Sequence, residues 1–200
     1  EMILATTTGT SATNRIEAMV RNAIYGIATA KSMGNKCPKV GILNVDGARQ
    51  VEKCLKELKD NGYDMEFADS IRADGGCVMR GNDLLVGAPD VMVTDTLSGN
   101  IFMKVFSSYT TGGDYEAQGF GYGPGVGEDY DRKVLIVSRA SGSPVVANAL
   151  KYAYDVVKGD ISNVARNEFA KVKKAKFDDI ISSLTKKEVK AEKVEVKMPD

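Results

Sequence analysis

The stretch DGGCVMRGNDLLVGAPDVMVTDTLSGNIFMK, residues 74–104, combines features that α/β proteins gather at one edge of a parallel sheet. Its short apolar run Val91–Val93 predicts a strand, and the acidic Asp95 follows the end of that strand. A Ser-Gly-Asn step, Ser98–Asn100, then leads into a helix predicted from Gly99 to about Ser108. Because ligands of such proteins bind outside the carboxyl ends of the strands, we expect a site here that the rest of the chain supports.

Strand-like and helix-like segments alternate along the rest of the chain. Helical spacing of apolar residues begins after Asn14, and residues 48–60 form a second amphipathic helix. Short β-rich runs at residues 40–45, 65–68 and 134–137 predict strands, the first of them buried and parallel. This alternation predicts one α/β domain, residues 1–184, with a mostly parallel sheet covered on both faces.

Two helices are predicted after the last of these strands. Ser143 and Pro144 have the residue types of an N-cap and a first helical position, and that helix runs to about Lys158. A second, charged helix follows over residues 161–184. Residues 185–200 form a charged tail, in which the sequence VEV is a candidate edge strand.

The composition is that of an ordinary soluble globular protein. Among the 200 residues, 27 Lys and Arg balance 27 Asp and Glu, so no net field favours a nucleic acid or an anionic membrane as partner. Neither a signal peptide nor an apolar run long enough for a bilayer is present in the sequence. The first residue is Glu1 and not a start methionine, which suggests a fragment or a processed form.

Cysteine and histidine usage limits the chemistry. The three cysteines, Cys37, Cys54 and Cys77, are odd in number and widely spaced, which argues for a reducing compartment, the cytoplasm, and against a disulfide framework. Without a C-x-x-C pair, a metal site is not expected, and we predict no cofactor. The absence of histidine excludes Ser-His and Cys-His nucleophile arrangements within this sequence.

Two turns from strand to helix are candidate anion sites. At the first, Ser98, Gly99 and Asn100 would bring polar groups and bare backbone to a helix N-terminus, which suits an anion. The second, Ser138–Pro144, adds Arg139, whose guanidinium can clamp two phosphate oxygens. Two such turns in one sheet would point to the same edge. The alternative is a pair of ordinary capped turns, with Ser98 as a cap and Arg139 on the surface.

Cys77 lies between glycines and close to Arg80, a setting that could bring a ligand near and lower the pKa of the thiol. The alternative, a small buried apolar residue, is the commoner role of a free cysteine. Cys37 and Cys54 have the sequence settings of that commoner role.

A glycine-rich connection, residues 110–131, is too long for an ordinary loop and predicts a mobile lid or a subunit contact. Its segment GFGYGPGVG, residues 119–127, fits neither the dinucleotide fingerprint nor the P-loop motif. A nucleotide-binding domain of the dehydrogenase type is therefore disfavoured.

Three segments of the chain resemble the C-terminal half of the phosphate acyltransferase of phospholipid synthesis. They are PKVGILNV at residues 38–45, GNDLLVGAPDVMVTDTLSGN at 81–100 and SGSPVVANAL at 141–150. The run from Asn100 to Gly142 is similar, more closely, to the alpha subunits of component C of glycine, sarcosine and betaine reductases. The chain resembles the C-terminal half of that longer subunit. It departs from the acyltransferase pattern where Asn44 is followed by Val-Asp-Gly and where Asp95–Asn100 reads DTLSGN.

The resemblance implies a three-layer α/β/α fold like that of phosphotransacetylases and isopropylmalate dehydrogenases. It implies acetyl transfer in amino-acid-fermenting anaerobes, in which an enzyme-bound acetyl thioester is attacked by phosphate and acetyl phosphate is released. The partners implied are the component C beta subunit and the selenoprotein component A, with no nucleic acid and no membrane. A homodimer is an assembly that the sequence leaves open.

Combined with this resemblance, the two turns and the cysteine give a predicted site. Cys77 is the predicted thioester-forming nucleophile, although the thiol could equally lie on the partner subunit. Asp95 is predicted to be catalytic as a member of the phosphate pocket. The residues predicted to bind phosphate or acyl phosphate are Ser98, Gly99, Asn100, Arg139, Ser141, Gly142 and Ser143. The alternative functions are a non-catalytic scaffold and a phosphate acyltransferase that acts on fatty acyl groups.

Overall fold

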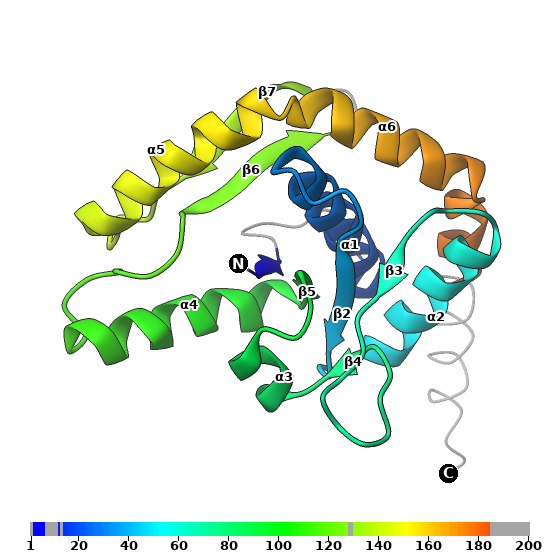
Figure 1. Ribbon diagram of the computed structural model, residues 1–200, viewed down its shortest axis with the longest axis horizontal. Helices are drawn as coiled ribbons and strands as arrows, with labels where there is room; N and C mark the ends of the chain where they lie inside the picture. The colour runs from blue at the N-terminus through cyan, green and yellow to red at the C-terminus, as the bar shows by residue number, and fades with distance from the viewer. Residues whose placement is uncertain (1, 7–11, 13, 128–129, 185–200) are drawn as a thin grey trace, which may run out of the picture.

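The computed structural model describes residues 2–6, 12, 14–127 and 130–184. Within these residues, a parallel sheet of five short strands forms the centre of the fold (Figure 1). Strand β2 lies in the middle and pairs with β5 on one side and with β3 and β4 on the other, while β1 pairs with β5. The strands are β1 (Ile3–Ala5), β2 (Lys39–Leu43), β3 (Glu66–Phe67), β4 (Val78–Met79) and β5 (Val91–Val93). The predicted mostly parallel sheet is confirmed.

Helices lie on both faces of this sheet, as the predicted three-layer α/β/α fold requires. Apolar residues of α1 and α2 form the main core with Val40, Ile42 and Val91. On the opposite face, Leu84 and Phe102 pack against a smaller cluster that includes Met92. The helices are α1 (Arg15–Ser32), α2 (Ala48–Asp60), α3 (Gly81–Val86) and α4 (Thr96–Thr111).

Local sequence signals explain where α1 and α2 begin and end. The Asn14 side chain accepts a hydrogen bond from the backbone N–H of Glu17 at 3.0 Å, as expected of an N-cap. Helix α2 has the bounds predicted from its apolar spacing, with Val51, Leu55 and Leu58 buried on one face. None of the described helices is long and apolar enough to cross a membrane.

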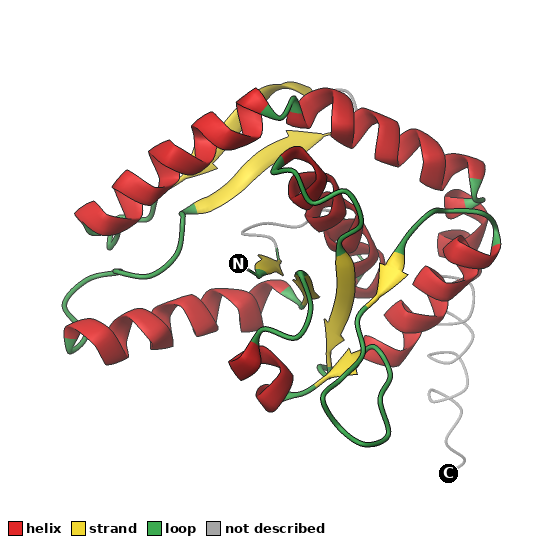
Figure 2. Cartoon of the chain, in the orientation of Figure 1, coloured by secondary structure: helices red, strands yellow, loops and turns green. Residues whose placement is uncertain are grey.

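A second group of elements packs on α1 from the side away from the sheet. It consists of an antiparallel hairpin, β6 (Tyr122–Gly127) and β7 (Tyr130–Ile136), and the helices α5 (Ser143–Lys158) and α6 (Ile161–Lys174). Ala28 of α1 is buried with Val156 of α5 and Ala165 of α6. In Figures 1 and 2 these two helices arch over the hairpin, which is separate from the parallel sheet.

The hairpin corrects two predictions. The run at residues 134–137 is not a strand of the main sheet, because β7 pairs with β6 and exposes Val134 and Ile136. The predicted connection at residues 110–131 contains β6, whose glycines hide its strand character because glycine has a low β-propensity.

Smaller differences concern element ends. Helix α4 begins at Thr96 and not at Gly99. The last predicted helix is interrupted at Ala175 and Lys176, where Lys176 has a φ of 65°, and helical structure resumes over residues 177–184. The strands β1 and β4 and the helix α3 were not predicted. The candidate VEV edge strand lies outside the described residues.

Gly159 joins α5 to α6 where both pack on α1. A Cβ atom at this position would overlap the backbone carbonyl of Ser32 at the end of α1. We therefore expect Gly159→Ala to lower the free energy of unfolding by about 3 kcal/mol, because neither backbone can move without disturbing the core. Gly81→Ala is the matched control, since a Cβ there has no atom within 4 Å, and its expected effect is within about 0.5 kcal/mol. Equal urea denaturation midpoints for the two variants would contradict this packing.

Candidate functional site

The first predicted turn connects β5 to α4 and is held by Asp95. The Asp95 carboxylate accepts hydrogen bonds from the backbone N–H groups of Leu97 and Ser98, both at 3.0 Å, and from the Ser98 hydroxyl at 2.7 Å. Asp95, not Ser98, is thus the N-cap of α4. The positive end of this helix dipole already has an anion within the chain, since the carboxylate occupies the N–H groups that a bound phosphate would use.

Arg15 is a neighbour of Asp95 that the sequence did not reveal. Its guanidinium lies 3.6 Å from the Asp95 carboxylate and 3.1 Å from that of Asp46, so the starts of α1 and α4 meet at the carboxyl edge of the sheet. Burial alone would raise the pKa of Asp95, but the hydrogen bonds from Ser98 and Leu97 and the charge of Arg15 outweigh it and lower the pKa. A carboxylate held in this way is a poor general base.

Gly99 and Asn100 have separate roles in this turn. Gly99 is buried, and a Cβ there would overlap the Thr6 side chain, whose hydroxyl donates to the backbone carbonyl of Asp95 at 2.8 Å. Asn100 is exposed at the start of the second turn of α4. The close approach of Thr6 explains the glycine without any ligand.

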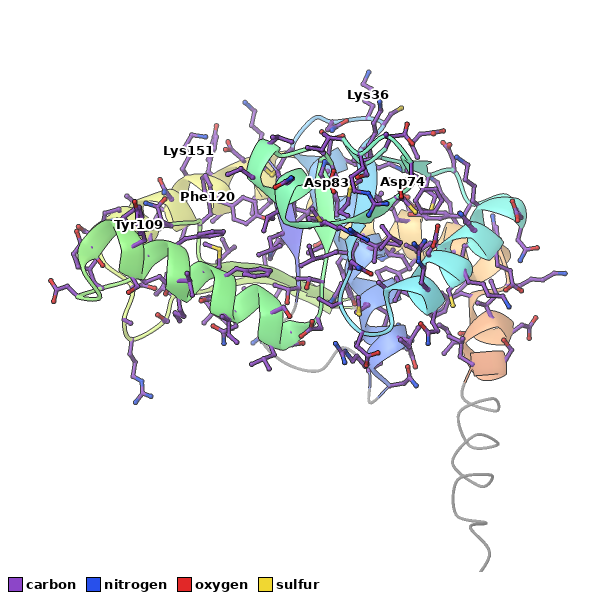
Figure 3. All side chains as sticks on the ribbon, turned by 90° about the horizontal axis from the view of Figure 1, so that it is seen from below. Lys36, Asp74, Asp83, Tyr109, Phe120 and Lys151 are labelled. Atoms are coloured by element: carbon purple, nitrogen blue, oxygen red, sulfur yellow. The ribbon has the colours of Figure 1, made fainter. Side chains whose placement is uncertain are left out.

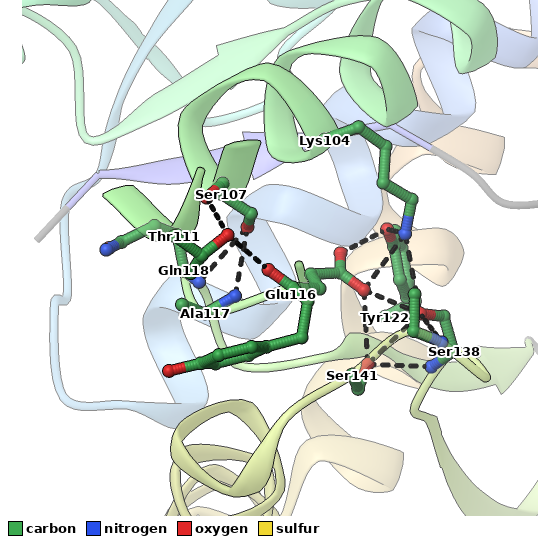
Figure 4. A network of polar contacts seen from close by, with 11 residues as sticks. Lys104, Ser107, Thr111, Glu116, Ala117, Gln118, Tyr122, Ser138 and Ser141 are labelled. Atoms are coloured by element: carbon green, nitrogen blue, oxygen red, sulfur yellow. Dashed lines mark hydrogen bonds and ion pairs between the residues drawn. The ribbon is translucent and has the colours of Figure 1, made fainter. Parts of the chain in front are cut away.

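The second predicted turn belongs to a polar network centred on Glu116 (Figure 4). The Glu116 side chain is 3% exposed, yet its carboxylate accepts from four side chains. Its donors are Lys104 Nζ at 2.9 Å, Tyr122 Oη at 2.7 Å, Ser138 Oγ at 2.7 Å and Ser141 Oγ at 3.1 Å. The network joins α4, β6 and the turn that follows β7.

These contacts keep Glu116 ionised. Burial by itself would raise the pKa of Glu116, but the hydrogen bonds from Ser138, Lys104 and Tyr122 outweigh that effect and lower the pKa to about 2. The backbone adds to the fixation, because Gly142 N–H donates to the Glu116 carbonyl at 2.9 Å. The turn from Ser138 to Gly142 is therefore rigidly attached to Glu116.

Arg139 lies at the exposed tip of this turn. It makes no ion pair with any residue that the structure describes. Helix α5 starts directly after the turn, and its N-cap is Gly142, without a side-chain cap. The predicted cap, Ser143, is instead the exposed first residue of the helix. An arginine without a carboxylate partner and a helix N-terminus without a capping side chain thus lie within four residues of each other.

Ser141 and Gly142 shape the turn from within. The Ser141 hydroxyl donates to Glu116 and also accepts from the backbone N–H of Ser138 at 2.9 Å. A Cβ at Gly142 would overlap the Tyr115 ring. These two predicted ligands are engaged with the chain itself, which leaves Arg139 and Ser143 exposed.

The two turns do not share a sheet edge. The expectation that they converge assumed that the strand before Ser138 lies in the parallel sheet, whereas β7 lies in the hairpin. The link between them is Lys104, whose Nζ is 3.4 Å from Ser138 Oγ. Lys104 follows Ser98 by six residues of α4, which is about 9 Å along a helix.

Cys77 is buried, and its thiol donates to the Glu52 carboxylate at 3.5 Å. Burial raises the pKa of this thiol to about 11, and the negative charge of Glu52 adds to the effect. Glu52 in turn pairs with Lys56 and Arg49, both at 2.9 Å. The setting preserves the thiol form, which does not support a nucleophilic role.

Of the other two cysteines, one is buried and one is exposed. Cys54 is buried, as its sequence setting indicates, but Cys37 is exposed, which corrects the prediction that it is packed. Position before Pro38 at the start of β2 leaves Cys37 outside the core.

Comparison with known proteins gives one family and two kinds of relative. Residues 1–200 match the model of a family described as fatty acid synthesis protein. The glycine/sarcosine/betaine reductase complex component C subunit alpha of Peptoclostridium acidaminophilum is 63% identical over 200 residues, which are 100% of this chain and 52% of that subunit. This chain therefore spans about half the length of that relative.

More distant similarity links the chain to enzymes named phosphate acyltransferase. Those of Fervidobacterium nodosum and Thermotoga maritima are 34% and 32% identical over 100 and 101 residues. Each alignment covers 48% of this chain and 28% of the relative.

Replacement of Glu116 tests the network. In Glu116→Gln an amide that donates replaces one oxygen acceptor, so we expect a loss of about 3 kcal/mol in the free energy of unfolding at pH 7. The pKa of about 2 in the folded protein is below the ordinary 4.5, so the stabilisation is present above pH 4.5 and is lost as the pH falls towards 2. Urea unfolding should therefore show the wild-type and variant stabilities converging across that interval.

Glu66→Gln is the matched control, because Glu66 is 57% exposed and pairs with Lys59 at 3.4 Å. Its expected cost is below about 1 kcal/mol. A cost for Glu116→Gln that is equally small, or independent of pH, would contradict the role of the network.

Thiol reactivity tests the environment of Cys77. In a Cys37→Ser background, we expect no rapid reaction of the folded protein with a disulfide reagent at pH 8, since the two remaining thiols are buried. Wild type should lose one thiol quickly, that of Cys37. Rapid reaction of the Cys37→Ser variant that disappears on adding Cys77→Ala would show that Cys77 is accessible, contrary to this structure.

Proposed function

The chain belongs to the fatty acid synthesis protein family, and from this premise we propose that it binds phosphate within an acyl-transferring subunit. In this proposal, the subunit forms acetyl phosphate from phosphate and an acetyl thioester carried by a protein. The relatives support the two halves of the proposal, since one is a subunit of a glycine/sarcosine/betaine reductase complex and the others are phosphate acyltransferases.

The observation that carries the proposal is the start of α5. Arg139 has no carboxylate partner among the described residues, and the adjacent helix N-terminus has no side-chain cap. A guanidinium can hold two phosphate oxygens at once, and the start of α5 adds a positive dipole end. Pro144 has no N–H and Val145 N–H donates to the Gly142 carbonyl at 3.1 Å, so the backbone donor that this helix start contributes is the N–H of Ser143. The turn before α4 is a weaker candidate for anion binding, because the N–H groups of Leu97 and Ser98 already donate to Asp95.

We assign the binding of phosphate to Arg139 and Ser143, and its positioning to the Glu116 network that fixes their turn. In this assignment the turn before α4 has a structural role, and Ser98 lies about 9 Å along the helix from Lys104. The residues of this turn are Asp95, Ser98, Gly99 and Asn100. Ser141 and Gly142 contribute through the shape of the loop. Lys104 pairs with Glu116 and neutralises its charge, which reduces the repulsion of an anion by this carboxylate.

The proposed reaction is an acyl transfer without redox change. A phosphate oxygen attacks the thioester carbonyl carbon and forms a C–O bond, and the carbonyl oxygen becomes the oxyanion of a tetrahedral intermediate. Collapse of this intermediate breaks the C–S bond, and the electron pair leaves with sulfur, which then takes up a proton. Arg139 would orient the phosphate, and its positive charge would stabilise the oxyanion.

The thioester is best carried by a thiol other than Cys77. A nucleophilic cysteine has to reach the thiolate form, which a pKa of about 11 and a hydrogen bond to Glu52 disfavour at neutral pH. We therefore propose that the thioester is presented by another part of a multi-component complex, such as the component C beta subunit. The acetyl group would originate on a selenoprotein component of the same complex.

Phosphate binding tests this assignment. Calorimetry with inorganic phosphate and with acetyl phosphate should detect binding to the wild-type chain, and Arg139→Ala should weaken it by about 10- to 100-fold, as expected for charge-assisted hydrogen bonds. Arg139→Lys should retain part of the affinity, because an ammonium keeps the charge but loses the bidentate geometry.

Arg132→Ala is the matched control, since Arg132 is an exposed arginine on β7 and its loss changes the net charge equally. This variant should bind phosphate as the wild type does. Absence of binding by the wild type, or equal weakening by both substitutions, would refute a phosphate site at Arg139.

A further inference from the structure

Lys104 is held in the Glu116 network by three acceptors (Figure 4). Its Nζ donates to Glu116 Oε2 at 2.9 Å, to Tyr122 Oη at 3.1 Å and, at a longer distance of 3.4 Å, to Ser138 Oγ. An ammonium has three N–H donors and no lone pair, so this arrangement matches the charged form of the side chain. A neutral amine has only two N–H donors, and its lone pair would face one of the acceptors.

The surroundings of this nitrogen also favour its charged form. The centroid of the Tyr122 ring lies 5.5 Å from Nζ, within the range of a cation–π contact. Burial alone would lower the pKa of Lys104, but the hydrogen bonds to Glu116 and Tyr122 outweigh that effect and raise the pKa. The side chain is nevertheless 43% exposed, so a small reagent can reach it. Its reactivity is therefore limited by charge and hydrogen bonding and not by burial.

The product of the proposed reaction is a reagent for amines. The lone pair of a neutral amine attacks the acetyl carbon of acetyl phosphate and forms a C–N bond. The C–O bond to phosphate breaks, phosphate leaves with that electron pair, and the nitrogen loses a proton. Lys104 contacts Ser138, which directly precedes Arg139, and a single oxygen atom separates the acetyl carbon from phosphorus. Acetyl phosphate bound at Arg139 and Ser143 therefore has its reactive carbon at the turn that Lys104 contacts.

Acetylation of Lys104 would damage the anion site. It replaces the ammonium with a neutral amide and removes the cation that pairs with Glu116. The buried Glu116 carboxylate would then keep only its three hydroxyl donors, and its uncompensated charge would repel a phosphate at the adjacent turn.

We infer that the three acceptors around Lys104 protect the site from acetylation by its own product. This inference rests on the proposed function, because it assumes that acetyl phosphate binds at the Arg139 turn. Glu116 and Tyr122 thus have a role beyond the orientation of this turn, since they hold Lys104 as an ammonium without a free lone pair. The chain keeps a cation beside the anion site and does not expose a nucleophile to the acyl group.

Acetylation rates of single lysines test the protection. The folded chain is treated at pH 8 with N-hydroxysuccinimidyl acetate, which carries no phosphate, and peptide mass spectrometry quantifies each acetylated lysine. Lys36 is the internal reference, since it is exposed, has no ion pair among the described residues and projects from the periphery in Figure 3. Lys104 of the wild type should react at least about 10-fold more slowly than Lys36, because reaction has to break charge-assisted hydrogen bonds.

Two variants should remove the protection. Tyr122→Phe keeps the ring but lacks the acceptor oxygen, and it should accelerate acetylation of Lys104 about 3- to 10-fold. Glu116→Gln lacks the carboxylate, and the acceleration should reach at least about 10-fold. Lys36 should react as before in both variants. Circular dichroism checks the fold of each variant, and Tyr122→Phe alone decides the test if Glu116→Gln does not fold.

Tyr109→Phe is the matched control for the loss of a tyrosine hydroxyl. Tyr109 is 91% exposed and lies on α4 at the periphery of the molecule in Figure 3. This variant should leave the acetylation rate of Lys104 unchanged.

Acetyl phosphate as the reagent tests the link with the anion site. In the two unprotected variants, the ratio of the Lys104 rate to the Lys36 rate should be higher with acetyl phosphate than with the succinimidyl ester, because the turn binds the phosphate group. Excess inorganic phosphate, or the additional substitution Arg139→Ala, should remove this difference between the reagents.

Two results would overturn the inference, and they differ in their meaning for the proposed function. Equal rates of Lys104 and Lys36 in the wild type, or no acceleration in the folded variants, would show that the acceptors do not protect the amine, and would leave the phosphate site intact. Protection against the ester together with equal ratios for the two reagents would show that acetyl phosphate does not bind beside Lys104, which would also contradict the site at Arg139.

Discussion

Helix α1 approaches β5 so closely that no side chain fits between them at Gly26, where a Cβ would lie 2.5 Å from Val91 Cγ1. This contact allows α1 to pack closely on the sheet. The side of α1 that faces away from the sheet is also apolar, and Ala28 on that side packs with Val156 of α5. The hairpin, α5 and α6 are therefore attached to the sheet through α1, so the position of the Arg139 turn depends on the close contact of Gly26 with the Val91 side chain.

The Arg139 turn is held a second time by Glu116, through hydrogen bonds and not through apolar packing. A buried carboxylate with four donors gains little net stability over an apolar core, because its desolvation opposes its hydrogen bonds. Its contribution is to geometry, because the hydroxyls of Ser138 and Ser141 both donate to it and so hold the turn in the observed arrangement. Apolar packing on α1 thus sets where α5 lies, and the Glu116 network sets how the turn before α5 is oriented.

The sequence predicted those features of the fold that depend on residues close together along the chain. The bounds of α2 and the cap at Asn14 follow from local residue types and spacing. It did not predict the hairpin, because the partner of a glycine-rich strand is specified by pairing and not by its own pattern. Arg15 and Glu116 were missed for a related reason: Arg15 meets Asp95 only once the strands have assembled, and Glu116 is a single acid within a glycine-rich segment. The sequence located the two turns before α4 and α5. It did not show which of their backbone N–H groups could bind an anion, because that depends on which side chain caps each helix.

Lys104 connects the turn to the outer face of α4. As a residue three positions after Ile101, it lies beside an exposed apolar stripe of α4 that Leu97, Ile101, Val105 and Tyr109 form. An ammonium that pointed into solvent would put a charge at the edge of this stripe, but the salt bridge to Glu116 at 2.9 Å draws it towards the turn. The same ion pair therefore neutralises the carboxylate beside a proposed anion site and leaves the exposed face of α4 uncharged.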